Sequence, residues 1–246
     1  MTSTSVGYAD KQALTALQID MRLEMPLSWR SGAPSARQSL LRRIADPQQQ
    51  EFALDVVDYL VRQANPRAAS ELAHILGGGG SEWEVTQNGD HYALTRRAVG
   101  PVADVIESVP DADRARSHLL TAWNKLMGRN PDPGAAYRES IRAIEAVGKP
   151  LVSPNNSKTT LGTIVGELRA HPERWSFVLD HSDVKTVITM ADAVWKGQQD
   201  RHGTDDPDVP LNVSQEEADA AFHIALAVTR IFGARLLSPG TNASAK

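Results

Sequence analysis

The chain contains no cysteine in its 246 residues. This absence excludes disulfide bonds, thiolate catalysis and cysteine-ligated zinc sites, and it agrees with a reducing compartment. No apolar run approaches the roughly 18 residues that a membrane-spanning helix requires. The N-terminal sequence MTSTSVG also lacks the basic and then apolar pattern of a secretion signal. We therefore expect a cytoplasmic protein with no membrane span.

Several motifs that mark well-known enzymes are missing as well. The sequence has no nucleophile elbow, no His-Glu-x-x-His zinc motif and no dinucleotide-binding fingerprint. The glycine run at residues 77–80 is followed by Ser81 and Glu82, whereas a phosphate-binding P-loop needs Gly-Lys-Ser/Thr at that point. We interpret the run as a helix end that leads into a strand, and we expect no cofactor.

Charge is distributed unevenly along the chain. The formal net charge of −4 argues against a protein that coats nucleic acid by bulk electrostatics, although a local basic site stays open. Residues 111–160 contain eight Lys or Arg against five Asp or Glu. In residues 198–220, by contrast, Arg201 alone faces seven acidic residues. Any anion site is therefore expected to draw on the basic segment.

The hydrophobic pattern predicts a mainly α fold. A turn signal at Asn88-Gly89 between two alternating runs predicts one β-hairpin near residues 82–95. We expect an N-terminal α+β region at residues 1–110, a C-terminal helical bundle at 111–237 and a disordered tail at 238–246. Apolar residues at helical spacing predict helices at 10–21, 36–44, 48–62, 68–76, 99–107, 111–127, 133–147, 160–170, 183–196 and 215–236.

Two of the C-terminal helices have further marks in the sequence. Residues 184–195 place Val184, Val187, Ile188, Ala191, Val194 and Trp195 on one apolar stripe. The last helix starts with Ser214 and Glu217, which fit a capping box. This helix is apolar on most faces, so we expect it either at the centre of a bundle or in a dimer interface, and we expect a homodimer through it.

The candidate site lies at residues 195–203, which end in Arg-His-Gly. An adjacent Arg201 and His202 in a polar break between two apolar helices could bind a phosphate and transfer a proton. Gln198 in the same segment could support them. The alternative is that the pair only caps or solvates a helix end.

Residues 133–147 carry two stripes. Tyr137, Ile141 and Ile144 are expected to face the core. A neighbouring stripe contains three charged residues, Arg138, Arg142 and Glu145. Charge pairing within the helix accounts for this stripe. In the alternative interpretation, Glu145 or one of the arginines reaches the Arg201-His202 loop and orients it.

A metal site is a weaker alternative. Asp205, Asp206 and Asp208 closely follow His202 and could supply the oxygen ligands that Mg²⁺ or Mn²⁺ prefers. The same residues also fit a solvated loop, since Asp favours turns and the neighbouring prolines stop regular structure.

Three stretches of the C-terminal half resemble the abortive-infection C-terminal group of bacterial proteins, which is placed within or near the all-helical HEPN superfamily. They are residues 136–145 (AYRESIRAIE), 159–162 (TTLG) and 195–203 (WKGQQDRHG). The resemblance covers about half of the chain. It implies a helical bundle, often dimeric, whose active members cut RNA without metal through an Arg, four to six intervening residues and a His.

The chain departs from this motif at its cationic position. Arg201 directly precedes His202, and the residue at motif spacing is Lys196. Lysine is a point charge that cannot reproduce the bidentate fork of arginine. The resemblance therefore carries over His202, with Arg201 and Lys196 as alternative phosphate partners.

Together these features predict a phage-defence or toxin-type protein with a metal-independent RNA-cleaving or RNA-binding site at the Arg-His-Gly loop. The alternative function is a non-enzymatic interaction or sensor module of a defence system, in which the loop is structural. The acidic residues beside the loop favour the alternative, because they repel phosphate unless residues 111–160 supply cations.

Overall fold

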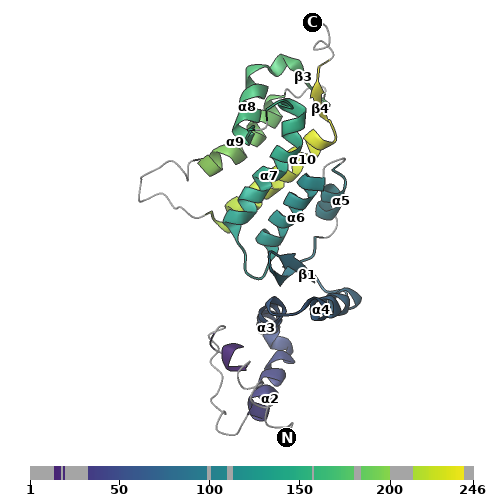
Figure 1. Cartoon of the computed structure of the whole chain (residues 1–246), viewed down its shortest axis with the longest axis vertical. Coiled ribbons are helices and arrows are strands. Elements are labelled where there is room, and N and C mark those ends of the chain that lie inside the picture. The colour runs from purple at the N-terminus through teal and green to yellow at the C-terminus, as the bar shows by residue number, and fades with distance from the viewer. Residues whose placement is uncertain are drawn as a thin grey trace, which may run out of the picture. The chain divides into compact units, whose positions relative to one another are not determined.

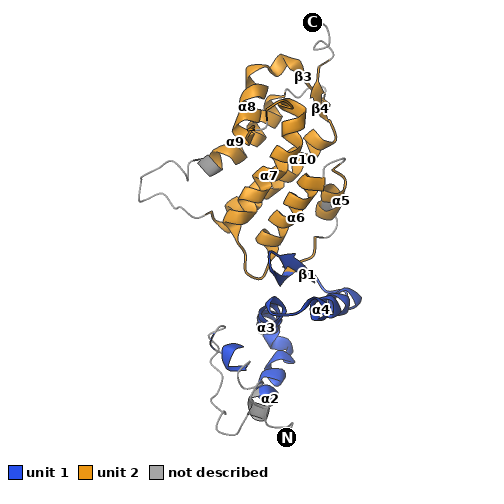
Figure 2. Ribbon diagram, in the orientation of Figure 1, with its two compact units in different colours: residues 1–94 blue, residues 95–246 orange. Residues whose placement is uncertain are grey.

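The molecule is mainly helical, as the sequence predicts, and its described residues also form two small two-stranded sheets (Figure 1). It divides into two compact units, residues 1–94 and 95–246 (Figure 2). The computed structural model describes residues 14–17, 19, 33–98, 101–109, 113–156, 158–179, 184–199 and 213–240.

Unit 1 contains a small helical core and the expected hairpin. Its helices and strands are α2 (Ala33–Ile44), a 3₁₀ turn (Pro47–Gln49), α3 (Gln50–Arg62), α4 (Pro66–Gly78), β1 (Trp83–Asn88) and β2 (His91–Arg96), which continues into unit 2. Residues 14–17 are helical and pack Leu14 and Leu17 with Leu40 and Val56. The hairpin turns at Gly89, whose φ of 64° suits glycine. The sequence therefore predicts α2, α3 and α4 to within a few residues, whereas the bounds of the helix expected at 10–21 lie outside the described residues.

A buried carboxylate connects α3 with β2. Asp58 is only 2% exposed, and its Oδ1 accepts a hydrogen bond of 2.8 Å from the Leu94 backbone amide. Its Oδ2 forms an ion pair of 2.6 Å with Arg62 one turn later on α3. Because Asp is rarely buried without partners, these contacts explain why a charge is tolerated here.

Unit 2 is a bundle in which the long helices α7 and α10 lie at the centre (Figure 1). Helices α6 and α8 pack on α7, and α9 packs on α8 and α10. The helices are α5 (Pro101–Glu107), α6 (Asp113–Met127), α7 (Pro133–Val152), α8 (Leu161–Ala170), α9 (Lys185–Gln199) and α10 (Gln215–Gly233). All six correspond to helices that the sequence predicts.

The last helix owes its apolar character to this bundle. Ser214 and Glu217 form the capping box that the sequence predicts. The buried side chains of α10 include Phe222, Ala225 and Phe232, which belong to the core of unit 2. The apolar stripe of α9 is buried in the same core. The composition of α10 is therefore explained within one copy of the chain.

The described structure differs from the sequence prediction at several boundaries. Helix α5 packs with unit 2, because Ile106 and Val109 are buried in its core, and the division between units falls at residue 94 rather than 110. Helix α7 continues past residue 147 to Val152 with Pro150 in its last turn. Helix α10 ends at Gly233 instead of residue 236.

A second small sheet was not predicted. Strand β3 (Trp175–Phe177) pairs antiparallel with β4 (Leu237–Pro239), so Ser238 and Pro239 are strand residues and not a disordered tail. Between α10 and β4 the chain leaves the helix at Arg235, whose φ of 52° lies in the left-handed region that is common just after a helix end. Small, polar residues at the C-terminus predicted a disordered tail from residue 238, but backbone hydrogen bonds to β3 order Ser238 and Pro239.

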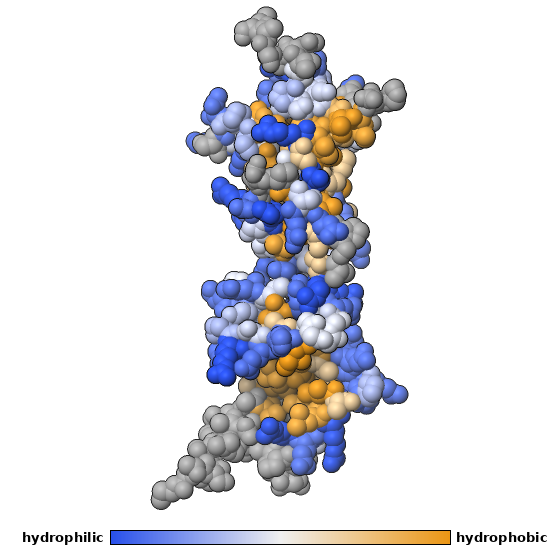
Figure 3. Space-filling model, turned by 90° about the vertical axis from the view of Figure 1, so that its right-hand side faces the viewer, coloured by the Kyte–Doolittle hydropathy of each residue, from blue (hydrophilic) through white to orange (hydrophobic). Residues whose placement is uncertain are grey.

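The described surface keeps some large apolar side chains exposed. Figure 3 shows hydrophobic surface among hydrophilic side chains on one face of the molecule. Such residues include Leu60 on α3, Ile75 on α4, Leu120 on α6 and Val178 just after β3. Scattered exposure of this kind is ordinary for folded proteins. Among the residues that the structure describes, no helix is both long and apolar enough to cross a membrane.

Candidate functional site

Part of the predicted site lies outside the described residues. This applies to Arg201, His202, Asp205, Asp206 and Asp208, and to the side chain of Gln198 in α9. The structure does describe the helix end that leads into this segment. It also describes every residue of the stripe on α7.

Residues of α7, the start of α8 and the last turns of α9 meet around the end of α9. The Tyr137 hydroxyl on α7 donates a 2.8 Å hydrogen bond to the Val194 carbonyl. A methyl group placed on Gly197 would collide with this hydroxyl. On α8, a methyl group on Gly162 would lie 2.5 Å from the Trp195 ring. The two glycines therefore allow α7, α8 and the last turn of α9 to approach closely.

Lys196 already has a carboxylate partner. Its Nζ lies 2.9 Å from Asp192, and Asp192 is also 2.9 Å from Arg169 of α8. Burial alone would raise the pKa of the Asp192 carboxyl, but hydrogen bonds and positive charge from Lys196 and Arg169 outweigh it and lower this pKa. Asp192 therefore stays ionised near neutral pH and neutralises part of the charge that Lys196 could offer to a phosphate.

The charged stripe on α7 is mostly paired. Arg142 forms an ion pair of 2.7 Å with Glu139, as the interpretation of charge pairing within the helix expects. Glu145 lies 3.7 Å from Lys149 and accepts a 2.8 Å hydrogen bond from the Leu161 amide at the start of α8. These contacts give Glu145 a role in joining α7 to α8. Arg138 is exposed and does not line the cavity described next.

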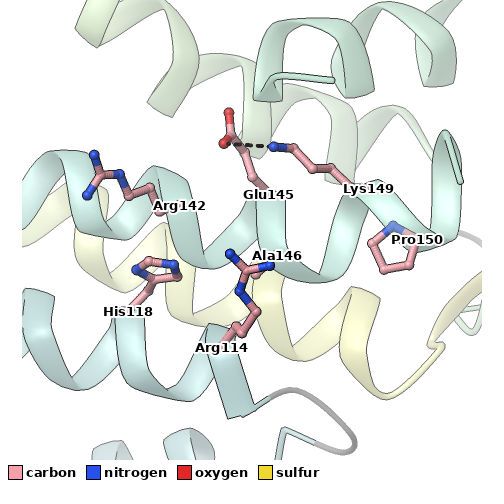
Figure 4. Close-up of a pocket in the computed structure, with 7 residues that line it drawn as sticks. All are labelled: Arg114, His118, Arg142, Glu145, Ala146, Lys149 and Pro150. Carbon is pink, nitrogen blue, oxygen red and sulfur yellow. Dashed lines mark ion pairs between the residues drawn. The ribbon is translucent and has the colours of Figure 1, made fainter. Parts of the chain in front are cut away.

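A cavity of about 590 Å³ lies between α6 and α7 (Figure 4). We call it the basic cavity. Helix α6 contributes Arg114 and His118, and α7 contributes Arg142 and Lys149 across from them. Its complete lining is Arg114, His118, Arg142, Glu145, Ala146, Lys149 and Pro150. Two arginines, one lysine and one glutamate therefore line the space together with His118.

His118 is held in this cavity by a carboxylate. Its Nδ1 lies 2.6 Å from Glu139 Oε2 on α7, and the other oxygen of Glu139 binds Arg142. The side chains of His118 and Glu139 are 28% and 15% exposed. Because a carboxylate only accepts hydrogen bonds, Nδ1 donates, and Nε2 carries the lone pair when the ring is neutral.

The sequence alone does not single out His118, Arg114 or Lys149 as site residues. His118 and Glu139 are 21 positions apart on different helices, so no local spacing joins them. A usable signal was present within each helix. Arg114 and His118 are four residues apart, and Arg142 and Lys149 are seven apart, so each pair shares a helical face. The excess of Lys and Arg over Asp and Glu in residues 111–160 already indicates that these two helices carry basic faces.

The described residues contain no group of three or more His, Asp or Glu side chains arranged to hold a metal ion. Comparison of the chain with known protein families, with curated proteins and with solved structures gave no match.

Proposed function

We propose that the chain is a cytoplasmic protein of phage-defence or toxin type whose unit 2 is a HEPN-like helical domain that binds RNA. The observation that carries the proposal is the basic cavity, where Arg114, Arg142 and Lys149 surround one space with His118. The resemblance of residues 136–145, 159–162 and 195–203 supplies RNA as the expected ligand.

The electrostatics of the cavity suit the phosphates of RNA. Arginine offers a planar fork to phosphate oxygens, and lysine offers a compact point charge. Binding would release counterions from the RNA backbone, so a local cluster of cations is effective even on a chain of net charge −4. The volume is also within the range of roughly 300–1,000 Å³ that is usual for ligand sites.

The Arg201-His202 loop remains the site that the resemblance proposes for RNA cleavage, with Lys196 as an alternative cation. Lys196 contributes less than the sequence suggests, because Asp192 pairs with it. The close packing of Gly197 on Tyr137 favours the alternative function, a non-enzymatic interaction or sensor module in which this segment is structural. The homodimer through α10 stays a prediction, since the buried residues of α10 are covered within the unit.

The proposal can be tested by removing two cations from the basic cavity. We expect Arg114→Ala combined with Lys149→Ala to weaken binding of a short single-stranded RNA by about tenfold for each cation, because a charge-assisted hydrogen bond contributes about 1.5 kcal/mol or more. Fluorescence anisotropy of labelled RNA at fixed salt concentration measures the affinity.

The matched control is Arg67→Ala combined with Arg174→Ala. Both of these arginines are exposed and lie outside the cavity lining. Their replacement removes two positive charges, as the replacement of Arg114 and Lys149 does. This control should bind RNA nearly as tightly as the wild type. An equal loss in both double variants would show that net charge, and not the basic cavity, determines binding. Failure of the wild type to bind RNA would reject the proposed function.

A further inference from the structure

We propose that the basic cavity is itself a metal-independent RNA-cleaving site, in which His118 is the catalytic base and Glu139 is its positioning residue. The inference rests on the proposed function, since RNA must first bind in the cavity. It assigns the chemistry to α6 and α7, whereas the resemblance points to the Arg201-His202 loop.

The geometry distinguishes His118 from other described histidines of unit 2. His171 and His223 lie 3.6 Å from Glu173 and Asp219, and neither lines the cavity. His118 has the short contact of 2.6 Å to a mostly buried carboxylate. This contact fixes the plane of the ring and occupies Nδ1, so Nε2 is the nitrogen left to take a proton from RNA.

Glu139 is itself fixed. Its second oxygen accepts a 2.7 Å hydrogen bond from Arg142. One oxygen of Glu139 therefore binds His118 on α6, and the other binds Arg142 on α7. A carboxylate held in this way also stabilises the imidazolium that forms when His118 takes up a proton. The arrangement is that of a base and its orienting partner, which proton transfer during catalysis requires.

The cavity also supplies cations, which the reaction needs to stabilise negative charge on the phosphate. Arg114, Arg142 and Lys149 line the same space as His118. Attack on a phosphodiester places additional negative charge on the non-bridging oxygens, and cations at fixed positions stabilise this charge. Arg114 lies on α6, across the cavity from Arg142 and Lys149 on α7, so both helices supply cations to a bound phosphate.

The reaction is an internal transfer that needs neither water nor metal. His118 Nε2 removes the proton of a ribose 2′-hydroxyl, and the 2′-oxygen forms a bond to the adjacent phosphorus. The bond from phosphorus to the 5′-oxygen of the next nucleotide breaks, and that oxygen receives the proton from the His118 imidazolium. The products are a 2′,3′-cyclic phosphate end and a 5′-hydroxyl end, so atoms and charge balance.

The experiment compares wild type with His118→Asn in the full chain, with His223→Asn as the matched control. Single-stranded RNA is incubated with each protein in EDTA, and rates are measured under single-turnover conditions with RNA saturated by protein. We expect wild type and H223N to cleave RNA to 2′,3′-cyclic phosphate ends. H118N should cleave about 10²- to 10⁴-fold more slowly, which is the usual contribution of a general base.

Binding measurements separate the two proposals. RNA binding by wild type without cleavage would overturn the catalytic role of His118 and leave the proposed function intact. Cleavage by H118N at the wild-type rate would also overturn the catalytic role of His118. If His202→Ala then abolished cleavage, the reaction would belong to the Arg201-His202 loop. Absence of both binding and cleavage in wild type would reject the proposed function itself.

Two further measurements keep the test independent of whether H118N folds. A DNA oligonucleotide of the corresponding sequence must resist cleavage by wild type, because it lacks the 2′-hydroxyl whose oxygen attacks the phosphorus. Its cleavage would contradict the mechanism. Glu139→Gln should lower the single-turnover rate at saturating protein while melting near the wild-type temperature. An unchanged rate in E139Q would remove Glu139 from the proposal.

Discussion

Gly162→Ala is expected to lower the free energy of unfolding of unit 2 by about 1–3 kcal/mol, the usual cost of overpacking a close contact. The added methyl group would lie 2.5 Å from Cε2 and 2.7 Å from Nε1 of Trp195. The indole ring would have to move, or α8 would have to separate from α9. Chemical denaturation followed by circular dichroism measures the loss.

Gly166 on the same helix provides the control. A methyl group on Gly166 meets no heavy atom within 4 Å. Gly166→Ala should therefore leave stability unchanged or raise it by about 0.5–1 kcal/mol, since alanine favours a helix interior over glycine. Equal effects of the two substitutions would show that the contact between Gly162 and Trp195 does not fix the position of α9.

Asp58→Ala should destabilise unit 1 by about 2–3 kcal/mol, because it removes a charge-assisted hydrogen bond and leaves a buried amide without an acceptor. The Leu94 amide, which now donates to Asp58, should exchange its hydrogen faster. Hydrogen exchange of the peptide that covers residues 83–96 measures this effect locally, even if unit 2 masks it in a global unfolding curve.

Asp55 is the matched position, because it is exposed on the same helix. Asp55→Ala should stay within about 0.5 kcal/mol of wild type, as most surface substitutions do. If the Leu94 amide exchanged at the same rate in Asp58→Ala as in wild type, Asp58 would not be the group that holds β2 against α3.

The helices of unit 2 could be predicted because burial imposes the helical period on the sequence. The stripe of α9 from Val184 to Val194 and the cap of α10 at Ser214 are both local patterns, and both are confirmed. The hairpin could be predicted from another local pattern, a turn signal at Asn88-Gly89 between two alternating runs, and Gly89 has the positive φ that such a turn needs.

Features that depend on tertiary contacts could not be predicted. The strands β3 and β4 have only three residues each, which is too short for a visible alternation, and they meet through backbone hydrogen bonds. Helix α7 continues past residue 147, and Gly148 in this extension lies close to Ile164 and Phe232, which are far away in the sequence. Proline in the last turn disturbs few hydrogen bonds of the helix.

The candidate site shows the same division. The stripe of charges on α7 was visible in the sequence, and Arg142 belongs both to that stripe and to the basic cavity. The partners that give it chemical meaning, His118 and Arg114, come from the preceding helix and require the packing of α6 on α7. A one-dimensional pattern can show that cations share a face, but it cannot show which histidine they surround.

The central claim is that RNA binds in the basic cavity, and photo-crosslinking of RNA to the full-length protein tests it most directly. Mass spectrometry of the crosslinked peptides identifies the residues in contact with RNA. We expect crosslinks within α6 (Asp113–Met127) and α7 (Pro133–Val152), and we expect them to decrease when Arg114 and Lys149 are replaced by alanine. Crosslinks confined to unit 1, or to residues 195–212, would contradict this account.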